Sequence, residues 1–139
     1  MKIQSLALIA IAVLFVTFTN CKKKTVTVPT CTAGTGGTMS VATFAIHNGD
    51  TLLNYEIHPD TAYVKFSATT SPGTSPSNYD TYFESEAGED HIHCNKLRCG
   101  DYFIYRTAWD SVANKTYHGT AVVSLSSTDT EKDIYITVE

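Results

Sequence analysis

Residues 97–109, LRCGDYFIYRTAW, decide the fold of this chain. Gly100 stands between Leu97 and Tyr102, where its freedom to adopt positive φ permits a sharp turn. The turn runs directly into residues 102–109, which are rich in aromatic side chains and contain no glycine or proline. The stretch therefore predicts a tight turn followed by a β-strand.

Similar short segments with period-two alternation recur along the chain, and no run with helical spacing is long enough to indicate a helix. Turn signals separate the segments, which is typical of an all-β domain. We expect a single β-sandwich of about seven to eight mostly antiparallel strands. The segments are residues 41–47, 51–58, 62–69, 79–86, 90–94, 102–109, 120–125 and 134–138.

The first two segments predict a β-hairpin. Apolar side chains alternate in both residues 41–47 and residues 51–58, and Asn48-Gly49-Asp50 supplies a turn between them. In the second segment the alternating side chains are Leu53, Tyr55 and Ile57. Residues 70–78 are rich in Ser, Pro and Gly and predict a long exposed loop.

The order Leu97, Gly100, Tyr102 resembles the tyrosine corner of β-sandwich domains, with Cys99 where that pattern usually has proline. The resemblance implies that Leu97 is buried and that the Tyr102 hydroxyl bonds back to the backbone of the turn. Residues 83–138 resemble the prealbumin-like, carboxypeptidase-regulatory type of seven-stranded sandwich. Such modules serve as spacers, partner-binding domains and, rarely, enzymes, so the resemblance implies a fold more than a function. The hydrolase branch of that family ends in Tyr-Arg-Gly-Ser, unlike residues 135–139, so its activity is not expected.

Residues 1–20 have the composition of a secretory signal peptide. Lys2 supplies a positive start, and residues 3–18 are almost wholly apolar. The apolar run is shorter than the ~20 residues that a spanning helix needs, so a permanent transmembrane helix is the weaker alternative. The box Phe18-Thr19-Asn20-Cys21 follows and resembles the lipid-attachment box of bacterial lipoproteins.

The lipoprotein resemblance implies that Cys21 receives a diacylglyceryl group and becomes the first residue of the mature protein. Its acyl chains would anchor the protein in the cell envelope, which we expect to be the outer membrane of a Gram-negative bacterium, on either face. We interpret residues 1–20 as the signal peptide, 21–37 as a flexible tether rich in Thr and Gly, and 38–139 as the sandwich domain.

The distribution of charge argues against a nucleic-acid partner. The formal net charge of the chain is −4, but Lys2 and Lys22-Lys23-Lys24 supply four of its ten basic residues. From Thr25 onward the chain carries six basic and fourteen acidic residues. Such an acidic body repels phosphate backbones, so we expect the membrane, through Cys21, and an envelope protein or glycan as partners.

The remaining cysteines leave two alternatives open. Export to an oxidising space permits disulfides, and Cys94 and Cys99 flank a short turn that would bring them together. We expect either a Cys94–Cys99 disulfide or two reduced thiols. Cys31 would then stay unpaired or pair between chains, because it lies in the predicted tether.

Two histidines form the most suggestive cluster of metal-ligand side chains. A hairpin that turns at Ala87-Gly88 would place Glu84 opposite His91, with His91 and His93 two residues apart on one outward face. Two imidazoles and a carboxylate are ligands that Zn²⁺ accepts, although a structural zinc site normally uses four ligands. The alternative is a solvated polar face with no cofactor.

The sequence contains none of the usual catalytic motifs. It lacks a Gly-x-Ser-x-Gly elbow, a His-Glu-x-x-His pair, a phosphate-binding glycine loop and a Cys-x-x-Cys pair. We therefore predict a non-enzymatic binding or structural module of the cell envelope. The alternatives are a metal-binding module that uses the His91 and His93 face, and a small exported hydrolase.

Overall fold

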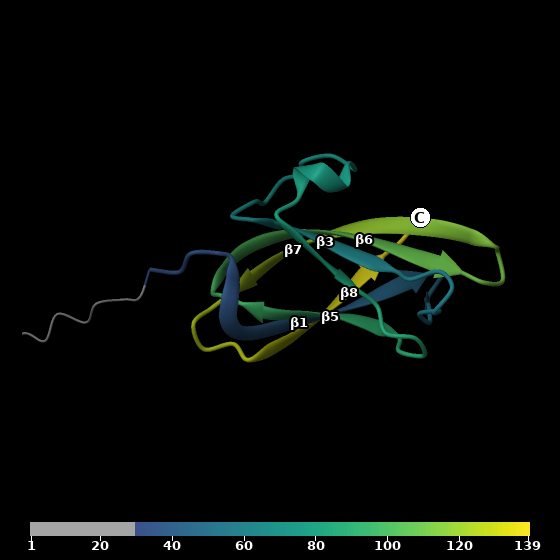
Figure 1. Cartoon of the computed structure of the whole chain (residues 1–139), viewed down its shortest axis with the longest axis horizontal. Helices are drawn as coiled ribbons and strands as arrows, with labels where there is room; N and C mark the ends of the chain where they lie inside the picture. Colours follow the sequence, from purple (N-terminus) through teal and green to yellow (C-terminus); the bar gives the residue numbers. More distant parts are fainter. Residues whose placement is uncertain (1–29) are drawn as a thin grey trace, which may run out of the picture.

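The computed structural model describes residues 30–139, and these form an all-β sandwich of eight strands, as predicted (Figure 1). The segment predicted to be a signal peptide and the predicted lipid-attachment residue Cys21 lie outside the described residues. The elements are β1 (Thr35–His47), β2 (Asp50–Thr51), β3 (Thr61–Phe66), the short 3₁₀ helix η1 (Pro76–Asn78), β4 (Thr81–Glu84), β5 (His91–Leu97), β6 (Gly100–Asp110), β7 (Lys115–Leu125) and β8 (Glu131–Thr137).

The strands form two sheets of four that pack face to face (Figure 1). In the β1 sheet, β1 pairs antiparallel with β2 and β5 and parallel with β8. In the β6 sheet the order is β4-β3-β6-β7, and all neighbours are antiparallel. The predominance of antiparallel pairs confirms the prediction, with the β1–β8 pair as the exception.

The core lies between the sheets because each strand alternates inward and outward side chains. In β3, Ala62 and Val64 are fully buried and Phe66 packs against the same core. In β1 the inward positions are Val41, Thr43 and Ala45, so Ala42, Phe44 and Ile46 share the outer face. The other core side chains are Met39, Ile92, Cys94, Leu97, Tyr102, Ile104, Ala108, Val123, Leu125, Ile136 and Val138.

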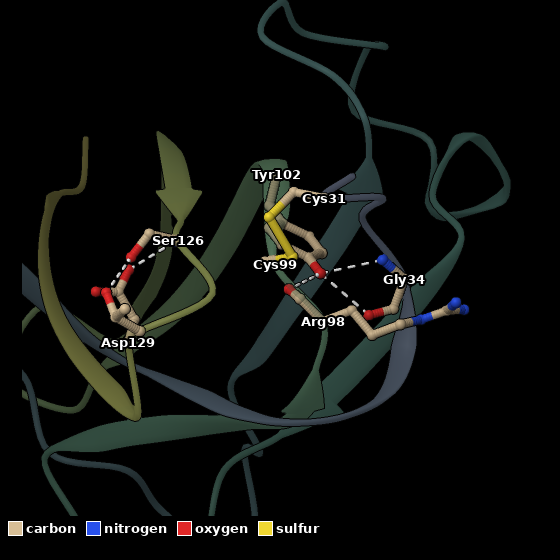
Figure 2. Close-up of a disulfide and its surroundings, with 8 residues drawn as sticks. Cys31, Gly34, Arg98, Cys99, Tyr102, Ser126 and Asp129 are labelled. Atoms are coloured by element: carbon tan, nitrogen blue, oxygen red, sulfur yellow. Dashed lines mark hydrogen bonds between the residues drawn. A yellow bond between two sulfur atoms is a disulfide. The ribbon is translucent and has the colours of Figure 1, made fainter. Parts of the chain in front are cut away.

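The turn between β5 and β6 is a tyrosine corner (Figure 2). The Tyr102 hydroxyl donates to the Arg98 carbonyl oxygen at 2.6 Å, and Leu97 is fully buried beneath the turn. Gly100 has φ +142°, and any side chain there would collide with the backbone of Ala33. The residue types that the sequence places at this turn are therefore required by its geometry.

The same tyrosine holds the N-terminal segment, which corrects the predicted tether. The Gly34 N–H donates to the Tyr102 hydroxyl at 3.0 Å, and the Arg98 N–H donates to the Gly34 carbonyl at 2.9 Å. Gly34 is buried and β1 begins at Thr35, so the interpretation of residues 21–37 as tether is wrong from residue 31 onward. The composition of this segment predicted a flexible tether. Its small residues instead allow the backbone to pack closely against the turn between β5 and β6.

The disulfide joins Cys31 to Cys99, with their Cα atoms 5.0 Å apart (Figure 2). Both alternatives predicted for Cys94 and Cys99, a bridge between them or two reduced thiols, are therefore wrong, and so is the expectation that Cys31 stays unpaired or pairs between chains. Cys94 is an inward residue of β5 and is buried as a free thiol between the sheets, whereas Cys99 lies in the turn after β5. Burial raises the pKa of Cys94 to about 12, so its thiol is unreactive in the folded state.

The hairpin predicted from residues 41–58 is confirmed only at its turn. β1 and β2 pair at Ile46–Thr51 and His47–Asp50, but residues 52–58 form an irregular segment. In this segment Ile57 is 82% exposed, whereas Asn54 is 2% exposed. The polar residue turns inward because it meets the buried guanidinium of Arg106, whose Nη2 donates to Asn54 Oδ1 at 3.3 Å.

Candidate metal site

Strand β5 places two histidines on the outer face of the β1 sheet. Ile92 and Cys94 point into the core, so the alternating residues His91 and His93 point outward and remain half-buried. The spacing of two residues puts both imidazoles on one side of the strand, as the sequence predicted. The structure thus brings His91 and His93 together.

The two rings meet at their Nε2 atoms. His91 Nε2 lies 2.8 Å from His93 Nε2, and the ring planes are nearly perpendicular at 85°. Glu89 Oε2 lies 3.9 Å from His91 Nε2. Among residues 30–139, these three side chains are the one group of at least three potential metal ligands, and their ligand atoms all lie within 4.8 Å of one another.

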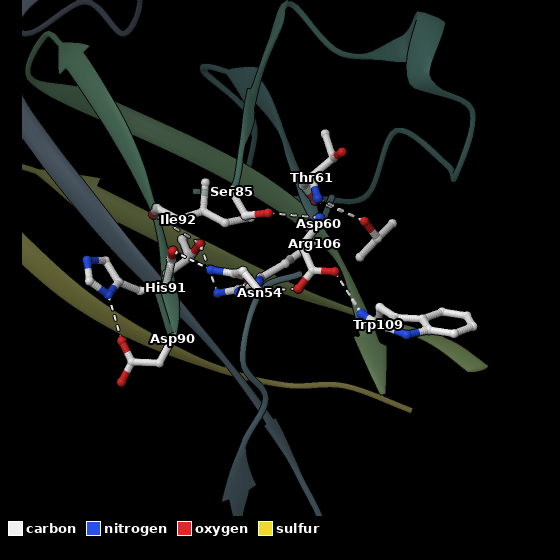
Figure 3. A network of polar contacts seen from close by, with 11 residues as sticks. Asn54, Asp60, Thr61, Ser85, Asp90, His91, Ile92, Arg106 and Trp109 are labelled. Carbon is white, nitrogen blue, oxygen red and sulfur yellow. Dashed lines mark hydrogen bonds and ion pairs between the residues drawn. The ribbon is translucent and has the colours of Figure 1, made fainter. Parts of the chain in front are cut away.

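Each imidazole also faces a carboxylate through its other nitrogen. His91 Nδ1 lies 2.7 Å from Asp90 Oδ1, so this nitrogen carries a proton and donates it to the carboxylate (Figure 3). His93 Nδ1 lies 3.7 Å from Glu131 Oε1 on β8. When both imidazoles are neutral, a proton on His91 Nδ1 leaves a lone pair on His91 Nε2, and His93 Nε2 then donates the hydrogen bond across the 2.8 Å contact.

An aromatic surface lies beside His91. In the strand register, Phe44 of β1 lies between His91 and Tyr135 of β8. The Phe44 ring centroid is 5.1 Å from that of His91 and 4.8 Å from that of Tyr135, with which it stacks. These contacts restrict the rotamers of His91, so the arrangement is supported by packing as well as by hydrogen bonds.

Glu84 does not take part, and the hairpin predicted to bring it there is wrong. Glu84 lies on β4 in the β6 sheet, whereas the histidines lie on β5 in the β1 sheet. The intervening residues cross from one sheet to the other, held by the Ser85 N–H to the Asp60 carbonyl at 3.0 Å and the Asn54 N–H to the Glu89 carbonyl at 2.8 Å. This crossing delivers Glu89, which sequence reasoning missed, to the histidines.

A buried polar network supports the site from inside (Figure 3). Asn54 Nδ2 donates to the His91 carbonyl at 2.8 Å, and Arg106 donates to both Asn54 Oδ1 and Thr43 Oγ1 at 3.3 Å. Arg106 comes from β6, so the network links the two sheets directly behind His91. The buried network therefore fixes the backbone position of His91.

Asp60 completes this network at the far side of Arg106. Asp60 Oδ1 accepts from the Trp109 N–H at 2.7 Å, and Asp60 Oδ2 lies 3.9 Å from Arg106 Nη2. Within the described chain, Asp60 Oδ2 and Arg106 Nε have no hydrogen-bond partner. Burial raises the pKa of Asp60 to about 6, and the Trp109 N–H and the Arg106 charge offset this only in part.

No protein-family model, curated protein or solved structure matches the chain. In residues 30–139 there is also no helix of the length and apolar character needed to cross a membrane.

Proposed function

We propose that this chain is a non-enzymatic, lipid-anchored module of the cell envelope that binds a divalent transition-metal ion through His91, His93 and Glu89. The observation that carries the metal assignment is the approach of two imidazole Nε2 atoms to 2.8 Å with a carboxylate beside them. Imidazole and carboxylate ligands suit Zn²⁺ best among the abundant ions, and Cu²⁺ binds the same ligand types.

The hydrogen bonds of the two imidazoles are compatible with the binding of such an ion. The proton shared by the two Nε2 atoms occupies the place where a metal would bind both lone pairs. Two Nε2 ligands in a tetrahedral zinc site lie about 3.3 Å apart, so the rings need to separate only slightly from their present 2.8 Å. His93 would then carry its proton on Nδ1, facing Glu131, just as His91 Nδ1 faces Asp90.

These outer carboxylates strengthen the proposal. Histidines that bind metals usually donate their second N–H to a carboxylate, which fixes the tautomer and orients the ring. Asp90 supplies this contact for His91 at 2.7 Å. Three protein ligands leave a fourth position for water on the solvent side, so the ion would exchange freely and would not be needed for folding.

Zinc should stabilise the folded protein in a way that depends on the three ligands. At free Zn²⁺ near 100 times Kd, linkage adds about 2.7 kcal/mol to the free energy of unfolding, enough to raise Tm by several degrees. We expect His91→Ala, His93→Ala and Glu89→Gln each to weaken zinc binding by about tenfold or more, measured by calorimetric titration of the purified full-length chain in detergent.

The matched control is His58→Ala, which removes one exposed imidazole that stacks on Trp109 and leaves the three ligands intact. It should bind zinc as the parent does. If His58→Ala and His91→Ala lose affinity equally, or if zinc leaves Tm unchanged, the metal assignment is wrong.

The lipid anchor rests on the apolar run and the box that ends in Cys21. We expect Cys21→Ser to move the chain from the membrane fraction to the soluble fraction without changing its circular dichroism, because Cys21 is not among residues 30–139, which supply the described core. Cys94→Ala, a change of a buried thiol, should remain membrane-bound. Mass spectrometry that finds Met1 intact on the mature protein would contradict the proposal.

A further inference from the structure

A second surface of the domain carries four tyrosines close together on the outer face of the β6 sheet. Its rings are Tyr63, Tyr79, Tyr82 and Tyr105. Tyr63 is central, with ring centroids 5.8 Å from Tyr79, 6.3 Å from Tyr82 and 6.1 Å from Tyr105. Tyr63, Tyr79 and Tyr82 line a groove of about 530 Å³, which we call the tyrosine groove; its walls also include Thr61, Pro76 and Glu84, and Tyr105 lies beside it.

Strand register builds the floor of this groove. Tyr63 of β3 lies directly opposite Tyr82 of β4 on one side and opposite Tyr105 of β6 on the other. Opposed residues in antiparallel strands share a face, so the three rings form a continuous row across three strands. Tyr82 is 59% exposed, although a large aromatic side chain gains by burial.

A preorganised loop builds the wall. Residues 67–80 rise above the β6 sheet and include η1 (Figure 1). The Tyr79 hydroxyl donates to the Gly73 carbonyl and Asn78 Nδ2 donates to the Pro72 carbonyl, both at 2.7 Å. A loop that is ordered before binding loses little entropy when a ligand arrives, which favours a binding role.

The polar side chains around the groove limit the chemical class of ligand that it can bind. Asp80 is already engaged, because Lys65 Nζ lies 2.9 Å from Oδ1 and the Phe66 N–H donates to Oδ2 at 2.7 Å. Among the described side chains lining the groove, the Glu84 carboxylate makes no hydrogen bond or ion pair and is exposed. The groove therefore offers aromatic faces, hydroxyl groups and one free carboxylate, and it repels anions.

We propose that the tyrosine groove binds a neutral carbohydrate, a short chain of pyranose units. The apolar C–H faces of pyranose rings carry partial positive charge and suit the electron-rich faces of tyrosine rings. Sugar hydroxyls can donate to Glu84 and exchange hydrogen bonds with the tyrosine hydroxyls. A basic peptide is the weaker alternative, because Lys65 already neutralises one of the two carboxylates. This inference is independent of the metal site, which lies on the other sheet.

The test titrates the purified full-length chain with cellotetraose, chitotetraose and maltotetraose, in a detergent without a sugar head group, and follows binding by NMR and calorimetry. We expect at least one tetrasaccharide to bind saturably. Tyr82→Ala should weaken that binding roughly tenfold and Glu84→Gln several-fold. The control Tyr135→Ala removes a tyrosine that is 65% exposed on the β1 sheet and should leave the affinity within about twofold of the parent value.

Three results would overturn the proposal. No tetrasaccharide perturbs the resonances of the groove at about 10 mM. Alternatively, Tyr82→Ala and Tyr135→Ala weaken binding equally, which places the sugar elsewhere. Finally, a proline- and lysine-rich decapeptide binds the groove and the sugars do not, which assigns the groove to a basic peptide.

Discussion

We expect the replacement of both Cys31 and Cys99 with alanine to lower the free energy of unfolding by roughly 4 kcal/mol. The bridge joins residues 68 apart, and closing a loop of that length in the unfolded chain costs about this much conformational entropy. The measurement is denaturant unfolding of parent and variant chains. Reducing agent should destabilise the parent by the same amount and leave the double variant unchanged.

Thiol counting identifies the partners independently. We expect Cys31→Ala to expose two more reactive thiols upon unfolding than Cys94→Ala, because the first variant frees Cys99 and keeps Cys94 while the second leaves the bridge intact. If Cys94→Ala instead releases a free Cys99, the bridge joins the other pair, and its shorter loop would stabilise by only about 2 kcal/mol.

Arg106→Met should cost about 3–5 kcal/mol of stability at neutral pH, because it removes the counter-charge of the buried Asp60 and leaves Thr43 Oγ1 and Asn54 Oδ1 without their hydrogen-bond donor. The matched control is Lys65→Met, which removes the cation of the half-exposed Lys65–Asp80 pair and should cost less than about 1 kcal/mol. Adding Asp60→Asn to Arg106→Met should recover part of the loss. A loss no larger than that of Lys65→Met would show that the buried pair does not stabilise the sandwich.

The pH dependence of this pair has a definite sign. Burial raises the pKa of Asp60 from 3.8 to about 6 in the folded state, so its contribution to stability is fully present below pH 3.8 and is lost as the pH rises through 6. Relative to Asp60→Asn, the parent should therefore lose up to about 3 kcal/mol between pH 4 and pH 7. In Arg106→Met the counter-charge is gone, so the loss should move to higher pH. A difference between parent and Asp60→Asn that does not change with pH would contradict this.

The strands could be predicted from the sequence because their signal is local. Alternation in residues 62–66 and 102–109 is sufficient to place Val64 and Ile104 in the core. The same alternation also puts Arg106 on the inward face with Tyr102, Ile104 and Ala108. That signal was present, but a charged residue in a strand is ordinarily assigned to solvent. Asn54 points inward because it accepts a hydrogen bond from the buried Arg106, so its position could not be predicted without first placing Arg106 in the core.

The candidate site was predictable only in part, for a related reason. The two-residue spacing of His91 and His93 fixes their common face within one strand. The third candidate ligand depends on whether residues 85–90 turn back in the same sheet or cross to the other, and a turn at Ala87-Gly88 is compatible with both paths. The crossing is determined by hydrogen bonds to residues 54 and 60, far away in sequence. Local patterns carry no information about such contacts.

The attachment of Cys31 to Cys99 also sets how far the domain can move if Cys21 carries a lipid. Ten residue steps separate Cys21 from Cys31, so a chain of this length spans at most about 36 Å when fully extended. A tether that continued to residue 37 would have reached about 20 Å further. The Cys31 end of the domain would then stay within about 36 Å of the lipid head groups. A partner fixed farther from the membrane than this reach plus the length of the domain would then lie beyond contact, whereas small diffusible ligands would not be limited in this way.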